Sequence, residues 1–150
     1  MKNSIESKLQ DFLNRYPGTI LWRKKKHARV AQKYITADEE VLYVFGGQRT
    51  LSHFDIFQST IVILTSKRIL VAHSNVLFSH RFLAITPDMF NDLTVKGGPI
   101  WGRIIIDTIK EKIYFSKIDK KALVEIKNEV STYMIQAKKD YTKPFKKALD

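Results

Sequence analysis

Short apolar segments separated by turn residues fill the middle of the chain. From residue 41 onward, β-branched and aromatic residues dominate these segments, which is typical of strands rather than helices. Most links between them are too short for the crossover that a parallel strand pair requires, so neighbouring strands are expected to run antiparallel. The pattern predicts a meander of seven strands, at residues 41–48, 58–64, 68–73, 78–86, 91–95, 103–108 and 112–116.

Before this region, apolar residues recur at helical spacing. They predict an amphipathic helix over residues 4–15, with Asn3 and Glu6 at the separation of a capping box and Pro17-Gly18 as its end. The apolar face of this helix is Ile5, Leu9, Phe12 and Leu13.

Residues 20–34 favour a second helix that is strongly basic. Its basic residues are Arg23, Lys24, Lys25, Lys26, Arg29 and Lys33. They leave a thin apolar face of Leu21, Trp22, Val30 and Tyr34. We therefore expect this helix to be weakly anchored.

A third helix is predicted after the last strand. Asp119 is a plausible N-cap, because its carboxylate can accept a hydrogen bond from a free backbone N–H of the first turn. Leu123, Ile126, Val130 and Tyr133/Met134 form its apolar stripe. Residues 138–150, interrupted at Pro144, are expected to be a frayed basic tail.

Composition places the chain among globular proteins of one domain. It has 150 residues, of which 44% are hydrophobic and 27% charged. Without cysteine, it has no disulfide, thiolate metal site or cysteine nucleophile. The N-terminus lacks the apolar run of a signal peptide, and the aliphatic runs are far shorter than the ~20 residues of a membrane-spanning helix. We expect a cytoplasmic protein, and this expectation allows peripheral contact with a membrane.

The net charge of +11 is unevenly distributed along the chain. Residues 1–37 carry nine Lys and Arg against two acids, residues 38–116 eight against eight, and residues 117–150 nine against five. The excess therefore belongs to the flanks, and an electrostatic partner is expected to bind there rather than to the neutral sheet.

The basic segment around Trp22 is the main candidate binding site. Trp22 beside a run of Lys and Arg resembles an interfacial anchor with polybasic charge, as found in proteins that contact anionic membranes. The alternative is nucleic acid, with Trp22 and Tyr34 stacking on bases and the basic residues contacting phosphates. The candidate residues are Trp22, Arg23, Lys24, Lys25, Lys26, Arg29 and Lys33.

Catalysis and metal binding find little support in the residue pattern. The long link at residues 47–57 is a candidate binding loop, through Arg49, His53, Phe54 and Asp55. Ser52, His53 and Asp55 are the residue types of a triad, but they are close in sequence, whereas triads are normally assembled from distant segments, and no nucleophile-elbow motif is present. His53, His73, His80 and Asp55 lack the spacing of a metal motif. No enzyme activity, cofactor or metal is predicted.

Two motifs carry a resemblance to a known family. Glu39-Glu40-Val41-Leu42-Tyr43 ahead of the first strand, and Ile63-Leu64-Thr65-Ser66-Lys67-Arg68-Ile69-Leu70 across the second hairpin, resemble the opening and the "LT-x-KRI" turn of bacterial PH-like domains of the YokE-like type. Lys112 to Ile118, leading into the last helix, is similar to the close of those domains. The resemblance covers residues 38–137. Residues 86–101, with Pro87 and Gly97-Gly98-Pro99, are less regular than the family pattern.

The resemblance implies an α+β, mainly β fold: a bent antiparallel barrel of seven strands closed by a C-terminal helix. A basic helical arm at residues 1–37 precedes this domain, and the tail at 138–150 follows it. PH-like domains are binding scaffolds, so we expect a non-enzymatic module for a protein partner, a second copy of the chain or an anionic membrane surface. Lys67 and Arg68 at the hairpin tip are candidate headgroup contacts. A nucleic-acid-binding regulator that uses the arm and tail is the alternative.

Overall fold

The computed structural model describes residues 4–49, 58–74 and 80–149, with the side chains of residues 74, 80 and 142–149 left out of the description. Two helices, α1 (Ile5–Arg15) and α2 (Lys24–Gln32), come first, and α3 (Leu123–Leu149) comes last. Between them lie β1 (Val41–Arg49), β2 (Ser59–Thr65), β3 (Ile69–Ser74), β4 (His80–Ile85), β5 (Phe90–Gly97), β6 (Trp101–Thr108) and β7 (Lys112–Asp119). Short 3-10 turns, η2 (Pro87–Met89) and η3 (Lys120–Ala122), precede β5 and α3.

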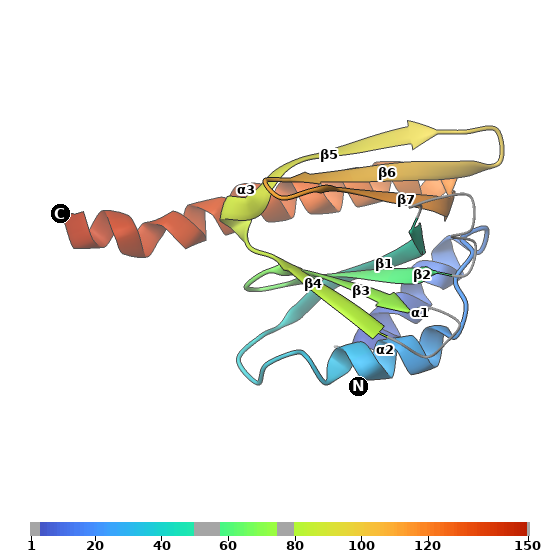
Figure 1. Cartoon of the computed structure of the whole chain (residues 1–150), viewed down its shortest axis with the longest axis horizontal. Helices are drawn as coiled ribbons and strands as arrows, with labels where there is room; N and C mark the ends of the chain where they lie inside the picture. The colour runs from blue at the N-terminus through green and yellow to red at the C-terminus, as the bar shows by residue number, and fades with distance from the viewer. Residues whose placement is uncertain (1–3, 50–57, 75–79, 150) are drawn as a thin grey trace.

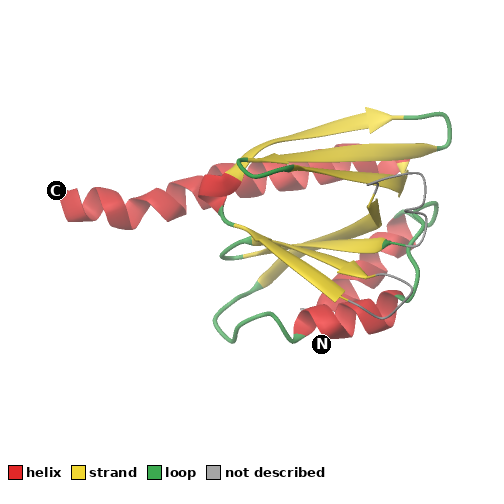
Figure 2. Ribbon diagram, viewed as in Figure 1, coloured by secondary structure: helices red, strands yellow, loops and turns green. Residues whose placement is uncertain are grey.

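The strands form one sheet, curled into a half-barrel. Their order is β4-β3-β2-β1-β7-β6-β5, and every neighbouring pair is antiparallel. The two halves of the sheet join where β1 pairs with β7, at Gln48↔Ser116 and Arg49↔Phe115 (Figures 1 and 2). The predicted antiparallel meander of seven strands is confirmed, with strand ends shifted by a few residues.

Helix α3 lies along the β5–β7 half of the sheet (Figure 1). Leu123, Ile126, Val130 and Met134 are buried, which confirms the predicted apolar stripe. Asp119 is the N-cap of the turn that leads into the helix, and its side chain accepts a hydrogen bond from Lys121 N at 3.0 Å.

The prediction of a frayed tail from residue 138 is wrong. Helix α3 continues through Pro144 to Leu149, and its C-terminal part extends beyond the sheet (Figure 1). Proline removes a single backbone donor, whereas most residues of this stretch are good helix formers. Lys138 Nζ also donates to Phe90 O at 2.9 Å, which ties this part of the helix to the start of β5.

Helix α1 belongs to the hydrophobic core. The predicted face of Ile5, Leu9, Phe12 and Leu13 is buried. The ring of Phe12 lies 6.5 Å from that of Tyr43 and 6.4 Å from that of Phe45, both on β1. The helix is capped by Ser4, whose Oγ accepts from Ser7 N at 3.1 Å, while Asn3 lies outside the described residues.

Helix α2 buries a different face from the one that the sequence predicted. His27, Ala28 and Ala31 are buried, whereas Trp22 and Tyr34 are 45% and 52% exposed. Helix α2 contacts α1 and β3, and the face that it buries carries His27 and two small alanines rather than its larger apolar residues. Gln32 Oε1 accepts from Ile5 N at 2.9 Å and links the two helices further.

Candidate functional site

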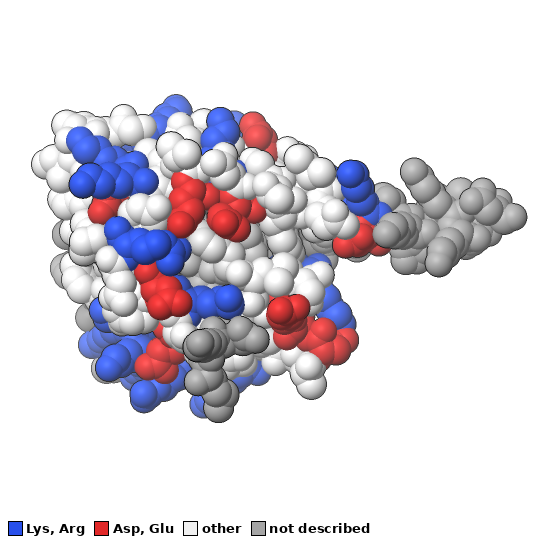
Figure 3. Space-filling view, turned by 180° about the vertical axis from the view of Figure 1, so that it is seen from behind, with Lys and Arg blue, Asp and Glu red and all other residues white. Residues whose placement is uncertain are grey.

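The exposed side of α2 presents a row of cations. Lys25, Lys26, Arg29 and Lys33 are exposed and recur at helical spacing, on the side opposite the buried alanines. Figure 3 views the molecule from behind, so left and right are reversed relative to Figure 1; Lys and Arg side chains gather at its lower left edge, the end of the molecule where α2 lies, with acidic side chains among them. We call these residues, with Trp22, Arg23 and Lys24 at the start of the helix, the α2 basic face.

The charged residues of the α2 basic face are all cationic. Helix α2 contains no Asp or Glu, and on its exposed side Arg29 Nε forms an ion pair with Glu6 Oε2 of α1 at 3.3 Å. Exposed ion pairs of this kind contribute little to stability. Trp22 lines a shallow hollow together with Leu21, Arg23, Lys24, Lys25 and Lys26. The α2 basic face thus combines positive charge with an exposed indole.

Tyr34 is engaged within the fold. Its ring stacks on that of Phe82 of β4, with centroids 3.8 Å apart and an angle of 27° between the planes. One face of the Tyr34 ring is therefore covered by the protein.

The hairpin tip between β2 and β3 is held by a buried carboxylate. Glu39, whose side chain is 1% exposed, accepts from Arg68 Nε at 3.0 Å and from Thr65 Oγ1 at 2.6 Å. Burial raises the pKa of Glu39, but the hydrogen bonds from Arg68, Thr65 and Thr36 outweigh it and hold the pKa at about 2.

The two cations of this hairpin are consequently occupied by contacts within the chain. Arg68 also donates to the carbonyl oxygen of Tyr34 at 2.9 Å, and Lys67 forms an ion pair with Asp38. The motif residues that resemble the family thus stabilise a turn. A role of Lys67 and Arg68 in ligand binding stays a prediction, and we leave them out of the proposed surface.

Of the predicted binding loop, only Arg49 can be placed. Its side chain is 14% exposed, and its guanidinium lies 3.7 Å from Glu111. Ser52, His53, Phe54 and Asp55 lie outside the described residues. His73 is buried, and its Nδ1 lies 2.9 Å from Thr60 Oγ1. Within the described ranges, no group of three His, Cys, Asp or Glu residues is placed to hold a metal ion.

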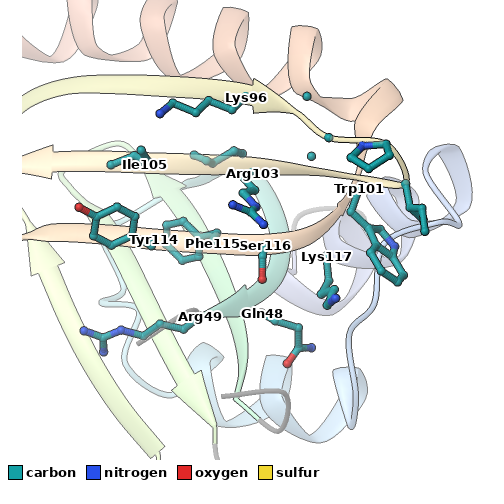
Figure 4. A pocket seen from close by; sticks show the side chains of 16 residues that line it. Gln48, Arg49, Lys96, Trp101, Arg103, Ile105, Tyr114, Phe115, Ser116 and Lys117 are labelled. Atoms are coloured by element: carbon teal, nitrogen blue, oxygen red, sulfur yellow. The ribbon is translucent and has the colours of Figure 1, made fainter. Parts of the chain in front are cut away.

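A second hollow, absent from the predictions, lies on the outer face of the β5–β7 half (Figure 4). Its volume is about 1010 Å³. The charged side chains in its lining are all cationic, namely Arg49, Lys96, Arg103 and Lys117. Trp101 and Tyr114 are its aromatic residues. We call this hollow the β5–β7 groove. Sequence reasoning missed it because its residues come from four strands and meet only through the sheet register.

The curled sheet with its C-terminal helix defines the PH-like fold, whose domains generally act as binding modules. The family model described as bacterial PH domain matches residues 35–132. The chain belongs to this family of bacterial PH domains.

Among solved structures, the chain is similar to a pleckstrin homology domain from Shewanella amazonensis, with 14% sequence identity and a TM-score of 0.49. That match covers 74% of this chain and 96% of the other. None of the curated proteins matches the chain. In the described part of the chain, no helix has the length and apolar character needed to cross a bilayer.

Proposed function

We propose that the chain is a non-enzymatic binding module that attaches reversibly to anionic membrane surfaces through the α2 basic face. The observation that carries this proposal is the arrangement of α2. Its alanine side packs against the core, while Lys25, Lys26 and Arg29 project outward beside the exposed Trp22. A helix held in this way presents its cations on a fixed surface.

The strength of such a contact follows from general magnitudes. Each basic residue near an anionic membrane surface contributes about 1 kcal/mol, and an interfacial tryptophan adds the burial of its apolar ring. Lys25, Lys26, Arg29 and Lys33 together then supply weak, salt-sensitive binding. Such binding suits reversible attachment.

The same charges would also attract nucleic acid, but the aromatic residues favour a membrane. A single-strand binder stacks successive bases on several exposed rings. Here one face of the Tyr34 ring is stacked on Phe82, so this ring has only its other face to offer to a base, and Trp22, 45% exposed, is the second aromatic side chain beside the cations. One exposed indole at the edge of a basic helix suits the interfacial region of a bilayer. A protein partner with an acidic surface is the remaining alternative.

Co-sedimentation with vesicles tests this proposal. The protein is mixed with vesicles of phosphatidylcholine alone and of phosphatidylcholine with phosphatidylglycerol, at low and at moderate salt. We expect binding to the anionic vesicles at low salt, a loss of binding as salt rises, and none to the neutral vesicles. The double variant Lys25→Glu/Lys33→Glu should abolish the binding to anionic vesicles at low salt.

A matched control separates a local contact from the effect of total charge. Lys121→Glu/Lys127→Glu makes the same charge change at two exposed positions in η3 and α3. We expect this control to keep most of the binding. Equal loss in both double variants, or tighter binding to single-stranded DNA than to anionic vesicles at the same salt, would contradict the proposal.

A further inference from the structure

The cations of the β5–β7 groove lie in a row across neighbouring strands. Lys96 of β5 pairs in register with Arg103 of β6. Arg103 in turn stands opposite Ser116 and Lys117 of β7, between the pairs Gly102↔Ile118 and Ile104↔Phe115. In Figure 4, the Arg103 side chain extends from β6 toward Ser116. The sheet register therefore brings three cationic residues from three strands to one end of the outer face.

A β-bulge sets the position of Lys117. Two residues of β7, Ser116 and Lys117, oppose the single residue Arg103, and Lys117 adopts the left-handed conformation with φ of 59°. This conformation is unfavourable for a residue with a side chain. It directs the Lys117 ammonium over the Trp101 ring, 4.1 Å from the centroid. Strained residues of this kind are concentrated at binding sites.

The charge of the groove is only partly balanced. Its lining in the described residues contains four Lys and Arg and no Asp or Glu. Glu111, 3.7 Å from the Arg49 guanidinium, is the acidic partner at its edge. The Nε of Arg49 is buried and has no hydrogen-bond partner among the described residues. An anion in the groove would relieve the repulsion between the cations and could satisfy this donor.

From these observations we propose that the β5–β7 groove binds a soluble small molecule that carries two or more phosphate groups. Guanidinium groups match phosphate oxygens in fork geometry, and ammonium groups add point charge. Because adjacent strands lie about 4.8 Å apart, cations on β5, β6 and β7 are spread over roughly 10 Å. This span exceeds a single phosphate and suits a row of them.

The groove has room for such a ligand. A volume of about 1010 Å³ lies at the upper end of the range for small-molecule sites. Trp101 at one end, and Ile105 with Tyr114 at the other, offer apolar surface to an organic part (Figure 4). The groove shares no residue with the α2 basic face, so this proposal stands or falls separately from membrane attachment.

Isothermal titration calorimetry with inorganic probes tests the proposal. We expect saturable binding of tripolyphosphate by the full chain, tighter than that of pyrophosphate and much tighter than that of orthophosphate at equal ionic strength. Arg103→Gln should weaken tripolyphosphate binding by roughly tenfold, as expected for the loss of a charge-assisted hydrogen bond. Lys127→Gln, an exposed position on α3, is the control and should leave the affinity unchanged.

Lys117→Gly separates binding from folding. Glycine accepts the left-handed conformation without strain, so this variant should be at least as stable to denaturant as the wild type. It should nevertheless lose affinity for tripolyphosphate about fivefold or more, because it lacks the ammonium group. If the affinity is unchanged, the bulge has a structural role only and the proposal fails.

Other results would also overturn it. Equal affinities in Arg103→Gln and Lys127→Gln would place the phosphate elsewhere, and a lack of saturation would show general charge attraction. Vesicles that carry a phosphorylated lipid distinguish the source of the phosphate. If Arg103→Gln weakens binding to those vesicles but leaves tripolyphosphate binding unchanged, a soluble ligand is excluded.

Discussion

Arg68 Nε donates to Glu39 Oε2 at 3.0 Å, across 29 positions of the chain, and this pair joins the start of β1 to the β2–β3 hairpin. The second guanidinium nitrogen bridges Glu39 and the carbonyl oxygen of Tyr34, at 3.1 and 2.9 Å. Thr65 donates to the same carboxylate. The two sequence motifs that resemble the family therefore meet in one hydrogen-bond network, which explains why these residue types occur together.

Removing Arg68 should destabilise the fold. In Arg68→Ala the buried carboxylate of Glu39 loses its cationic partner, and we expect the free energy of unfolding to fall by about 3 kcal/mol. Lys67→Ala, which removes the neighbouring ion pair with the exposed Asp38, should change it by less than about 1 kcal/mol. Urea unfolding of both variants measures the difference. If both variants lost less than about 1 kcal/mol of unfolding free energy, the hydrogen-bond network around Glu39 would contribute little to the stability of the fold.

His73 should make the protein sensitive to mild acid. Burial, with the charges of Arg49, His27 and Arg81, lowers the pKa of His73 to about 3 from an ordinary value of 6.5. The pKa of His73 is lower in the folded state than in the unfolded state. The free energy of unfolding therefore carries no penalty from this group above pH 6.5, and it falls as the pH drops from 6.5 toward 3. The loss reaches at most about 1.4 kcal/mol per pH unit for one proton.

Substituting His73 tests this assignment. His73→Gln keeps a polar group beside Thr60 but does not titrate, so its unfolding free energy should fall less steeply between pH 6.5 and 5 than that of the wild type. Glu39 adds a second decline below about pH 4.5, because its folded pKa of about 2 also lies below the ordinary value. Parallel pH profiles for His73→Gln and wild type above pH 5 would rule out His73 as the group responsible.

Gly47 allows β1 and β7 to approach where the two halves of the sheet join. A Cβ at this position would lie 2.7 Å from Ile118 Cγ1 and 2.9 Å from the backbone oxygen of Ser116. Gly47→Ala should therefore cost about 1–3 kcal/mol of unfolding free energy, as expected for overpacking against backbone. Gly97→Ala, with no atom within 4 Å of the added carbon, should be close to neutral. An unchanged free energy of unfolding in Gly47→Ala would show that β1 and β7 can move apart to accommodate the added carbon.

Phe12 tests whether α1 is part of the folded core. Its side chain is fully buried against rings of β1, so Phe12→Ala should lower the unfolding free energy by roughly 3 kcal/mol or more. If residues 1–37 were an independent arm, the same variant would leave the cooperative unfolding of the sheet unchanged. Circular dichroism in the strand region during thermal unfolding distinguishes the two results.

The strands could be predicted from the sequence because each is short, rich in β-branched residues and bounded by turn residues. The buried face of α2 could not be predicted in the same way: its larger apolar residues suggested one face, whereas His27, Ala28 and Ala31 are the residues that are buried. Pro144 suggested a break in the last helix, but α3 continues through it because most of the surrounding residues are good helix formers. Arg103 and Lys117 lie opposite one another only because of a β-bulge in the register of β6 and β7, and no sequence pattern reveals such a register.

The emission of Trp22 provides the most direct test of membrane attachment. Trp22 is 45% exposed, and we expect its fluorescence to shift to shorter wavelength when vesicles containing phosphatidylglycerol are added at low salt. Trp22→Phe should abolish the shift, since Trp101, the other tryptophan, lies in the separate groove. An unchanged shift in Trp22→Phe, or no shift in the wild type under conditions where the protein co-sediments with the vesicles, would contradict the proposal that the α2 basic face contacts the membrane.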